Sequence, residues 1–566
     1  MTEVAKKKIN MLARVLRSVL QLLRRNTLIR AIADIAYLLG AWRPISPPQT
    51  AAVKRFVETN KPYWSDPAVG GRDIMVGGHL SEAGPNYLFR AGVAAKAVQD
   101  ALASGDIVVV ANGFSYQWRS AKKAFASFGI SRWIFLGRKF MLIGPPIFLF
   151  SCAMSALCFI RLRTPRQLLD IHLGGIRIGD LIYDEVLRVT KLPTINAVDW
   201  NVYKVMARSW FYYYQYHLLF ISRDYSCLIA THTAYPEYGL LCRVALQRGV
   251  PVIETSDIQM SLYTSIDENN LPTYHQGINA RIRADLLSNR KNSEEREALA
   301  LKGLSQRLDS GVAQIDAQRA YSGRVYDLDE LRAALKIPVD QRIGFVFSHI
   351  FCDAPHLCSY MLYADYYQWL KSTLECCARS DDMAWIVKSH PSAAAYGEEG
   401  LVEAIVDAHG AANIYLSPDD LNTISIKECA DVLITVLGTV GLEYACLGIP
   451  TILAGVPFYA GFGFTYEPQT VQEYAKTVQK AASIERLSKQ QISTALQVFE
   501  AWEFNFDWNN TIVTTDVIAR VWGYGVSRDL THAYDLITEN LAVHNPKDLK
   551  LWHFAGEAVK RQLIQV

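Results

Sequence analysis

The 566-residue chain carries a formal net charge of +3, with 50% hydrophobic and 20% charged residues. One hydrophobic core stops growing at about 250–300 residues, so this length predicts at least two domains. The composition is that of a globular protein and excludes a disordered, collagen-like or coiled-coil chain. The small net charge also argues against a nucleic-acid partner, so we expect none.

The first 45 residues are strongly basic, with nine Lys and Arg residues against two acidic ones. From Leu12 to Leu23 apolar residues recur at helical spacing, which predicts an amphipathic helix on the acidic inner leaflet of a membrane. A surface helix docked on the first domain is the alternative. The ten cysteines form no C-x-x-C pattern and no cleavable leader is evident. We therefore expect a cytoplasmic protein that is peripheral at the inner face of the plasma membrane.

A second apolar stretch, Met141–Ile160, has no charged residue over twenty positions. Its length would allow a membrane span. Gly144, Pro145 and Pro146 interrupt its first third, however, and leave about 14 residues of uninterrupted helix. The stretch is therefore predicted to be a buried core helix rather than a membrane span.

Short apolar runs alternate with helical stretches from about residue 46. Asp106–Ala111 reads as a strand, and Ser226–Ala230 and Val252–Thr255 flank a helix as a β-α-β unit. Such repetition predicts a parallel sheet covered on both faces. A second series of strands follows helix-prone residues 281–334, at Ile343–Phe347, Trp385–Val387, Val432–Val436 and Thr451–Ala454.

The predicted fold class is α/β, with two doubly wound Rossmann-like domains that face each other across a cleft. We expect a basic N-terminal helical region at 1–45, an acceptor domain at 46–335, a donor domain at 336–500, and a helical tail at 501–566 that packs across both domains. In open parallel sheets a ligand lies beyond the carboxyl ends of the strands. The residues that follow each strand are therefore the candidate site residues.

Polar side chains follow the first two strands of the second domain. His349 and Asp353 come after Ile343–Phe347, and Lys388 and His390 come at the end of Trp385–Val387. The first pair suits a ligand-contacting loop, with a structural turn as the alternative; the pattern lacks the spacing of a closed zinc site. Lys388 and His390 alternate onto one face of the strand and offer a charge and a donor to a phosphate. A surface lysine and a capping histidine are the alternative.

Glycine-containing turns follow the next two strands. Gly438, Thr439 and Gly441 precede a helix start that would attract a phosphate, and Glu443 in its first turn would accept hydrogen bonds from ribose hydroxyls. Ordinary helix-start chemistry is the alternative. A later aromatic loop offers a stacking wall for a sugar or base, or else a packed Ω-loop; its candidate residues are Tyr459, Gly461 and Gly463.

These motifs in this order resemble the bacterial capsule-polysaccharide glycosyltransferases, which are similar to the Kdo-transferase and sialyltransferase-like branch of the GT-B fold. The resemblance rests on Lys-x-His-Pro, then Gly-Thr-x-Gly-x-Glu, then Gly-x-Pro-Phe-Tyr-x-Gly-x-Gly-x-Thr, within residues 340–470. It implies that His390, Gly438 and Thr439 contact the phosphate of a nucleotide-sugar donor. The family often has Ser-Ser where this chain has Gly438-Thr439, so the donor nucleotide stays open among CMP, UDP and GDP.

Two stretches of the first domain, Gly174–Asp184 and Thr231–Gly239, resemble segments of the same surface-polysaccharide proteins. A general base for the acceptor hydroxyl is expected from this domain, because the other domain binds the donor. Four side chains are candidates: Asp180, Asp184, His232 and Glu237. Asp180 is the first choice, and a helix N-cap is its alternative role.

The resemblance implies a glycosyltransferase that transfers a sugar to a glycan or lipid-linked acceptor in capsule or surface polysaccharide biosynthesis. We expect a metal-independent enzyme without a cofactor, because no Asp-x-Asp motif stands at a suitable position. Three alternatives remain at this point: a nucleotide-sugar 2-epimerase, a polyol-phosphate transferase, and a non-catalytic assembly factor at the membrane surface.

Overall fold

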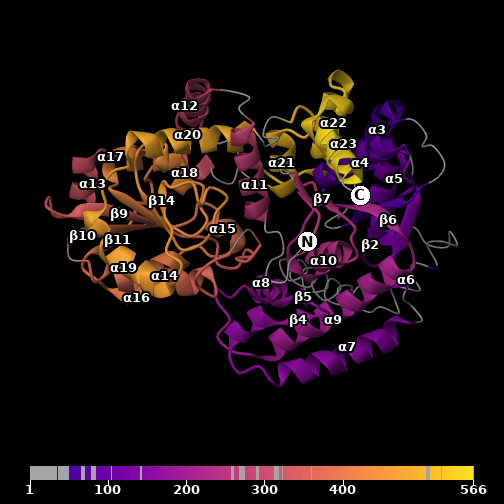
Figure 1. The fold of residues 1–566 in the computed structure, drawn as a ribbon, viewed down its shortest axis with the longest axis horizontal. Helices are drawn as coiled ribbons and strands as arrows, with labels where there is room; N and C mark the ends of the chain where they lie inside the picture. The colour runs from indigo at the N-terminus through magenta and orange to yellow at the C-terminus, as the bar shows by residue number, and fades with distance from the viewer. Residues whose placement is uncertain are drawn as a thin grey trace, which may run out of the picture.

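The computed structural model describes residues 35, 50–64, 71–77, 84–103, 105–139, 143–256, 260–266, 274–288, 292–310, 318–321, 323–357, 360–380, 382–504, 510–523 and 526–564. Apart from Ile35, the N-terminal region in which the amphipathic helix is predicted, up to residue 45, lies outside these residues. Two α/β units stand side by side, with the second unit in orange on the left of Figure 1. Each has its own six-stranded sheet.

The first sheet has the order β3-β2-β1-β6-β7-β8, parallel except for β8. Its strands are β1 (Asp73–Gly77), β2 (Ile107–Ala111), β3 (Arg132–Phe135), β6 (Tyr225–Ala230), β7 (Val252–Glu254) and β8 (Ser261–Tyr263). A two-stranded hairpin, β4 (His172–Leu173) and β5 (Ile176–Arg177), stands apart from it.

Helices cover both faces of this sheet because its side chains alternate between two cores. Ile74 and Val76 face one cluster and Met75 faces the other. The helices along the first domain are α3 (Thr50–Asn60), α4 (Pro85–Leu102), α5 (Arg119–Ala126), α6 (Leu136–Lys139), α7 (Gly144–Phe159), α8 (Gly179–Thr190), α9 (Trp200–Ile221) and α10 (Leu240–Gln247).

The second sheet is fully parallel, in the order β11-β10-β9-β12-β13-β14. Its strands are β9 (Arg342–Phe347), β10 (Met383–Lys388), β11 (Ile414–Leu416), β12 (Val432–Thr435), β13 (Thr451–Leu453) and β14 (Thr465–Tyr466). Both sheets thus have a Rossmann-like strand order, in which the first strand in sequence lies in the middle. The predicted pair of doubly wound domains is confirmed.

The helices of the second unit include three that precede its sheet. They are α11 (Tyr274–Leu287), α12 (Ser293–Ser310), α13 (Leu328–Leu335), α14 (Tyr366–Cys377), α15 (Ala393–Tyr396), α16 (Leu401–His409), α17 (Ile426–Cys429), α18 (Val440–Ala445), α19 (Val471–Gln479) and α20 (Lys489–Phe504). Ile282 and Leu304 share a core with Trp502, and buried Arg296 pairs with Glu500. The predicted domain boundary at 335 is therefore too late: α12 belongs to the second unit.

The C-terminal tail returns to the first domain. It forms α21 (Thr515–Trp522), α22 (Leu530–Val543) and α23 (Lys550–Ile564), drawn in yellow beside α3 and α4 in Figure 1. Tyr534 packs edge-on against Phe56, and Leu541 lies in the same core.

Helix α7 does not form the predicted buried core helix. It lies on the surface along α9, at the bottom of Figure 1, and only Gly144, Ser151 and Ser155 are buried. Several of its large apolar residues, such as Leu149 and Leu157, are exposed, whereas Ile147, Met154 and Phe159 are only partly buried against the core. Among the described residues, no helix combines the length and apolarity needed to cross a bilayer.

Candidate functional site

The carboxyl ends of three neighbouring strands form the donor-side candidate site. Strand β9 lies between β10 and β12, and adjacent strands are about 5 Å apart. The His390 backbone N–H, after β10, donates to Ser348 Oγ, after β9, at 3.0 Å. The next residue, His349, accepts from the backbone of Leu437, after β12, at 3.4 Å. The predicted phosphate-binding residues are therefore brought to one edge of the sheet.

His390 presents a neutral ring with one well-defined donor. Its Nδ1 accepts the Ser392 backbone N–H at 3.2 Å, which leaves the ring proton on Nε2. Burial lowers the pKa of His390 to about 4. At neutral pH this side chain offers a ligand an Nε2–H hydrogen bond and no charge.

Lys388 supplies the positive charge at this edge. Its Nζ donates to the Leu421 carbonyl at 2.9 Å, and the side chain is half-buried. Burial lowers the pKa of Lys388 to about 8, so the ammonium remains mostly charged at pH 7. An anion beside it would restore the usual pKa, because a nearby opposite charge favours the charged form.

His349 supports the turn after β12. Its Nε2 accepts the Val436 N–H at 3.2 Å as well as that of Leu437, and its ring stacks on Tyr366 with centroids 4.4 Å apart. Burial, with a smaller contribution from His390, lowers the pKa of His349 to about 3. These contacts position the turn, and the predicted ligand contact of His349 stays a prediction.

Gly441 of the 438–441 turn is explained by packing against Tyr459, whereas a Cβ on Gly438 would lie 2.8 Å from Thr435 Oγ1. The Tyr459 hydroxyl donates to the Gly438 carbonyl at 2.6 Å, and a Cβ on Gly441 would lie 2.3 Å from that hydroxyl oxygen. Tyr459 is fully buried, so its predicted role as a stacking wall for a sugar or base is wrong. Thr439 is half-buried at the N-cap position of α18, a helix of only six residues, and makes no side-chain capping bond.

The remaining members of the predicted donor site also have partners within the chain. Glu443 is buried, and its carboxylate accepts from Arg307 at 2.8 Å and from the Tyr321 hydroxyl at 3.2 Å. This ion pair replaces the predicted ribose contact. Gly461 and Gly463 adopt left-handed φ values of 78° and 87°, which form the loop after Tyr459.

On the acceptor side, Asp180 is held in a buried ion pair. Arg243 Nη1 and Nη2 donate to its two carboxylate oxygens at 2.8 and 2.6 Å. Burial alone would raise the pKa of Asp180, but the Arg243 guanidinium outweighs it and holds the pKa below its usual range. The predicted general base is therefore a structural carboxylate, and the alternative N-cap role is not seen either, since α8 has no side-chain cap.

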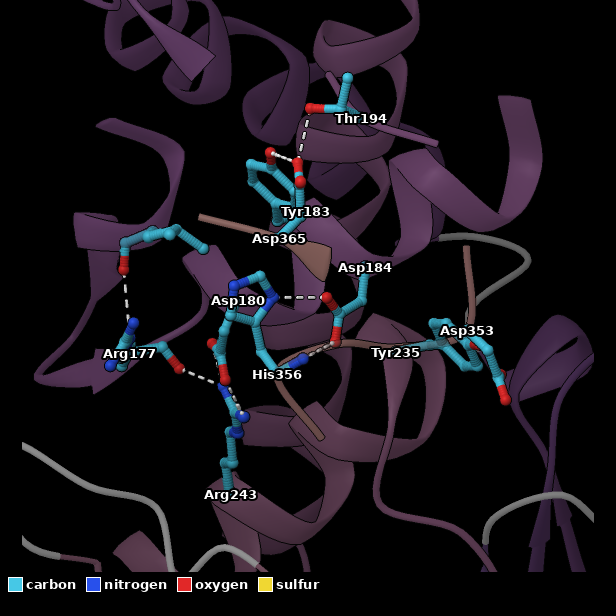
Figure 2. Close-up of polar contacts among 11 residues, drawn as sticks. Arg177, Asp180, Tyr183, Asp184, Thr194, Tyr235, Arg243, Asp353, His356 and Asp365 are labelled. Carbon is cyan, nitrogen blue, oxygen red and sulfur yellow. Dashed lines mark hydrogen bonds and ion pairs between the residues drawn. The ribbon is translucent and has the colours of Figure 1, made fainter. Parts of the chain in front are cut away.

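One turn further along α8, Asp184 pairs with His356 of the second domain. His356 Nδ1 and its backbone N–H donate to the two Asp184 oxygens at 2.6 and 3.2 Å, as Figure 2 shows. His356 Nε2 is buried, and no hydrogen-bond partner is found for it within the described part of the chain. Burial alone would lower the pKa of His356, but the Asp184 carboxylate outweighs it and raises that pKa.

The Asp184–His356 pair is one of several polar contacts between the domains. The Asp365 carboxylate caps α14 and accepts the hydroxyls of Tyr183 at 2.7 Å and Thr194 at 2.6 Å (Figure 2). Asp353 accepts the Tyr235 hydroxyl at 3.5 Å. Asp353, predicted to face the donor, thus lies where the two domains meet.

His232 and Glu237 follow β6, and the structure gives both of them contacts inside the first domain. His232 Nδ1 accepts the Ala234 N–H at 3.0 Å, so its remaining ring nitrogen carries the proton in the neutral form. Glu237 accepts the Asn112 side-chain amide, which comes from the end of β2. The predicted general-base roles of His232 and Glu237 stay predictions. The Ala234 contact occupies His232 Nδ1, the ring nitrogen that would accept a proton in the neutral form.

Residues 364–499 match the family described as capsule polysaccharide biosynthesis protein. The predicted relationship to these proteins is confirmed for that stretch, which includes Lys388, His390 and the 438–441 turn. No curated protein matches the chain significantly.

Several solved structures are similar in fold. The KpsC β-Kdo 2,4-transferase of Thermosulfurimonas dismutans is 13% identical over 49% of this chain and 79% of its own, with a TM-score of 0.30. The KpsC β-Kdo 2,7-transferase of the same organism is 15% identical over 50% and 79%, with a TM-score of 0.27. UDP-GlcNAc 2-epimerase from Neisseria meningitidis is 10% identical over 84% and 100%, with a TM-score of 0.22. At these TM-scores the likenesses carry no functional argument.

Proposed function

We propose that this protein is a glycosyltransferase of capsule or surface polysaccharide biosynthesis that uses a nucleotide-sugar donor. The observation that carries the proposal is the His390 Nε2–H donor, two residues after Lys388 at the carboxyl edge of a parallel sheet, within the stretch that matches the capsule family. A donor and a cation at this edge suit a phosphate group. Both interactions strengthen as the departing nucleotide gains negative charge, which favours the transition state.

We further propose the Asp184–His356 pair as the acceptor-activating group. A histidine whose Nδ1–H is held by a carboxylate is oriented and made more basic. The Nε2 atom of His356 would then take the proton of the acceptor hydroxyl. Because this atom is buried where the domains meet, an acceptor would reach it only when the two domains separate.

We expect a glycan or lipid-linked acceptor and a cytoplasmic location at the inner face of the membrane. Metal-independent departure of the nucleotide and the absence of a cofactor also remain predictions. Among the residues described, no group of three or more His, Cys, Asp and Glu side chains is arranged to hold a metal ion.

A thermal-shift screen with CMP, CDP, UDP and GDP tests the donor site. One nucleotide should raise the melting temperature of the wild-type protein by mass action. His390→Ala should lower the affinity for that nucleotide by about tenfold, because one hydrogen bond to a charged group is lost. His544→Ala, at an exposed histidine, is the matched control and should bind as the wild type does.

The proposal fails if no nucleotide shifts the wild-type protein, or if His390→Ala responds like the wild type. Incubation with the corresponding nucleotide sugar alone then separates two enzyme classes. Without an acceptor a transferase does not isomerise the nucleotide sugar, whereas an epimerase does.

A further inference from the structure

The surface formed by α7 and the adjacent edge of α9 exposes more large apolar side chains than a water-facing protein surface usually does. Leu149, Ala153, Leu157 and Ile160 recur along one side of α7 and are all exposed, with exposed fractions of 68% for Leu149 and 52% for Leu157. Trp200, at the start of α9, is 66% exposed. Contiguous exposed apolar side chains of this kind mark an interaction surface.

The inward side of α7 mixes small polar and apolar side chains, and Ile147, Met154 and Phe159 are partly buried against the first-domain core. Ser151 and Ser155 are buried against the protein, and their hydroxyls donate to the carbonyls of Ile147 and Cys152 in the same helix. A helix that packs on a protein core normally turns its apolar stripe inward. In α7 apolar side chains face outward as well as inward, since Leu149 and Leu157 are exposed, so the outer side of the helix suits an apolar partner.

Aromatic rings fix α7 along α9 so that it presents its side rather than its end. Phe148 packs edge-on against Phe211 at 5.6 Å, Phe150 against Tyr214 at 5.4 Å, and Phe159 against Tyr203 at 5.5 Å between ring centroids. Figure 1 shows the two helices side by side at the bottom of the first domain. A bilayer would therefore meet α7 lengthwise, in the plane of the headgroups.

Basic residues predominate around this face. Arg161, Arg163 and Arg166 follow α7 with no acidic residue before Asp170, and the charged residues within α9 are all basic, although Asp199 at its N-cap is exposed. Arg161 and Arg163 are exposed directly after α7. Trp200 stacks on Tyr203 at 4.8 Å near that end, where amphipathic rings suit the headgroup layer.

This charge pattern selects one occupant for the surface. A second copy of the chain would bring two basic faces together, and the N-terminal 45 residues carry a net positive charge as well. A second copy or the N-terminal segment would each add positive charge around the apolar stripe. Anionic lipid headgroups would instead neutralise Arg161 and Arg163. We propose that α7 and the edge of α9 dock on the surface of an anionic lipid bilayer, with the α7 leucines in the outer acyl region.

The inference does not rest on the proposed glycosyltransferase function. If both hold, they are connected by geometry: α9 packs against α8, which carries Asp184. The proposed acceptor-activating group would then lie on the membrane-bound domain. Lipid binding is nevertheless measured without donor or acceptor, so failure of one proposal is distinguishable from failure of the other.

Co-sedimentation of the full-length protein with vesicles tests the proposal. The vesicles are phosphatidylcholine alone and phosphatidylcholine with 30% phosphatidylglycerol. We expect binding to the mixed vesicles and weaker binding to the neutral ones. Leu149→Glu/Leu157→Glu should lower the partition coefficient for mixed vesicles at least about tenfold, because two buried leucine side chains are lost. Arg161→Gln/Arg163→Gln should lower it about fivefold per arginine on mixed vesicles only.

Leu287→Glu/Val339→Glu is the matched control, because it adds the same charge at two exposed apolar positions elsewhere. This control should bind like the wild type, and all variants should show the wild-type melting temperature. Wild-type binding by the α7 variant would overturn the proposal and assign any lipid binding to another segment. The proposal would also be overturned if the α7 variant bound lipid normally but changed from dimer to monomer in light scattering. The surface would then join two copies of the chain.

Discussion

The His356 side chain forms a buried ion pair between the two domains. It lies on the loop after β9, yet its nearest partner, Asp184, is on α8 of the first domain, 172 residues away in sequence. Buried ion pairs contribute little when intact but are costly to break, since one partner is left charged in a poor solvent. The contact between the two domains therefore depends on the protonation state of the His356 imidazole.

This pair predicts opposite pH trends for stability and activity. Because the pKa of His356 is raised in the folded protein, its stabilisation is fully present below the unfolded pKa of about 6.5 and is lost as pH rises through the folded pKa. His356→Gln should lower the melting temperature by roughly 5 °C at pH 6 and by less at pH 9. Transferase activity of the wild type should instead rise over this range, as Nε2 becomes able to accept a proton.

Kinetics separate a role in proton transfer from a structural one. His356→Gln should lower kcat about 10²–10⁴-fold and leave the nucleotide-induced thermal shift intact. His532→Gln, at an exposed histidine, should change neither the melting temperature nor kcat at any pH. A stability difference for His356→Gln that is constant or grows with pH would contradict the assignment.

At the scale of elements, the short helix α18 shows how a packing motif can resemble a ligand-binding motif. The glycine spacing suits close approach of a phosphate, but Gly441 is needed because Tyr459 occupies the space over it. The carboxylate in the first turn, Glu443, is likewise explained by Arg307. The two interpretations predict different results for the same substitution.

Gly441→Ala should destabilise the protein by about 1–3 kcal/mol, because its Cβ would overlap the buried Tyr459 hydroxyl. Tyr459→Phe removes that oxygen, so the cost of Gly441→Ala should fall in the Tyr459→Phe background. Urea unfolding of the wild type, the two single variants and the double variant measures the coupling free energy between Gly441 and Tyr459. If the glycine serves a ligand instead, nucleotide affinity would fall while stability stayed constant, and Tyr459→Phe would not rescue it.

The sequence patterns predicted many single strands and helices correctly. They did not predict the contacts that form between two elements distant in the sequence. The buried strands of the second sheet are apolar runs that end in polar residues, so His390 could be placed at a strand end. Strand β1 was missed, because DIMVG is short and flanked by glycines and polar residues. The contacts of Asp180 with Arg243 and of Asp184 with His356 join distant segments, and no spacing rule predicts them. Helix α7 was predicted to be buried because apolar composition alone does not reveal which side faces the protein.

At the scale of the whole molecule, the chain crosses between the two domains more than once. Helix α12 precedes the second sheet and packs on it, whereas α21, α22 and α23 follow that sheet and complete the core of the first domain. Each domain thus needs a segment that the linear order would assign to the other. Stability of the first domain should therefore depend on residues near the C-terminus.

Helix α22 offers a matched pair of residues with which to test this dependence. Leu541 is fully buried in the first-domain core, whereas Val543, two residues later, is 74% exposed. Leu541→Ala should destabilise the first domain by about 2–5 kcal/mol through lost burial and a cavity, while Val543→Ala should stay within about 0.5 kcal/mol of the wild type. Hydrogen exchange followed by peptide locates the effect. Amides of β1 and α4 should exchange faster in Leu541→Ala, and those of β9 and β12 should not. Equal acceleration in both sheets would show that the domains unfold as one unit, and no acceleration in β1 would separate the tail from the first-domain core.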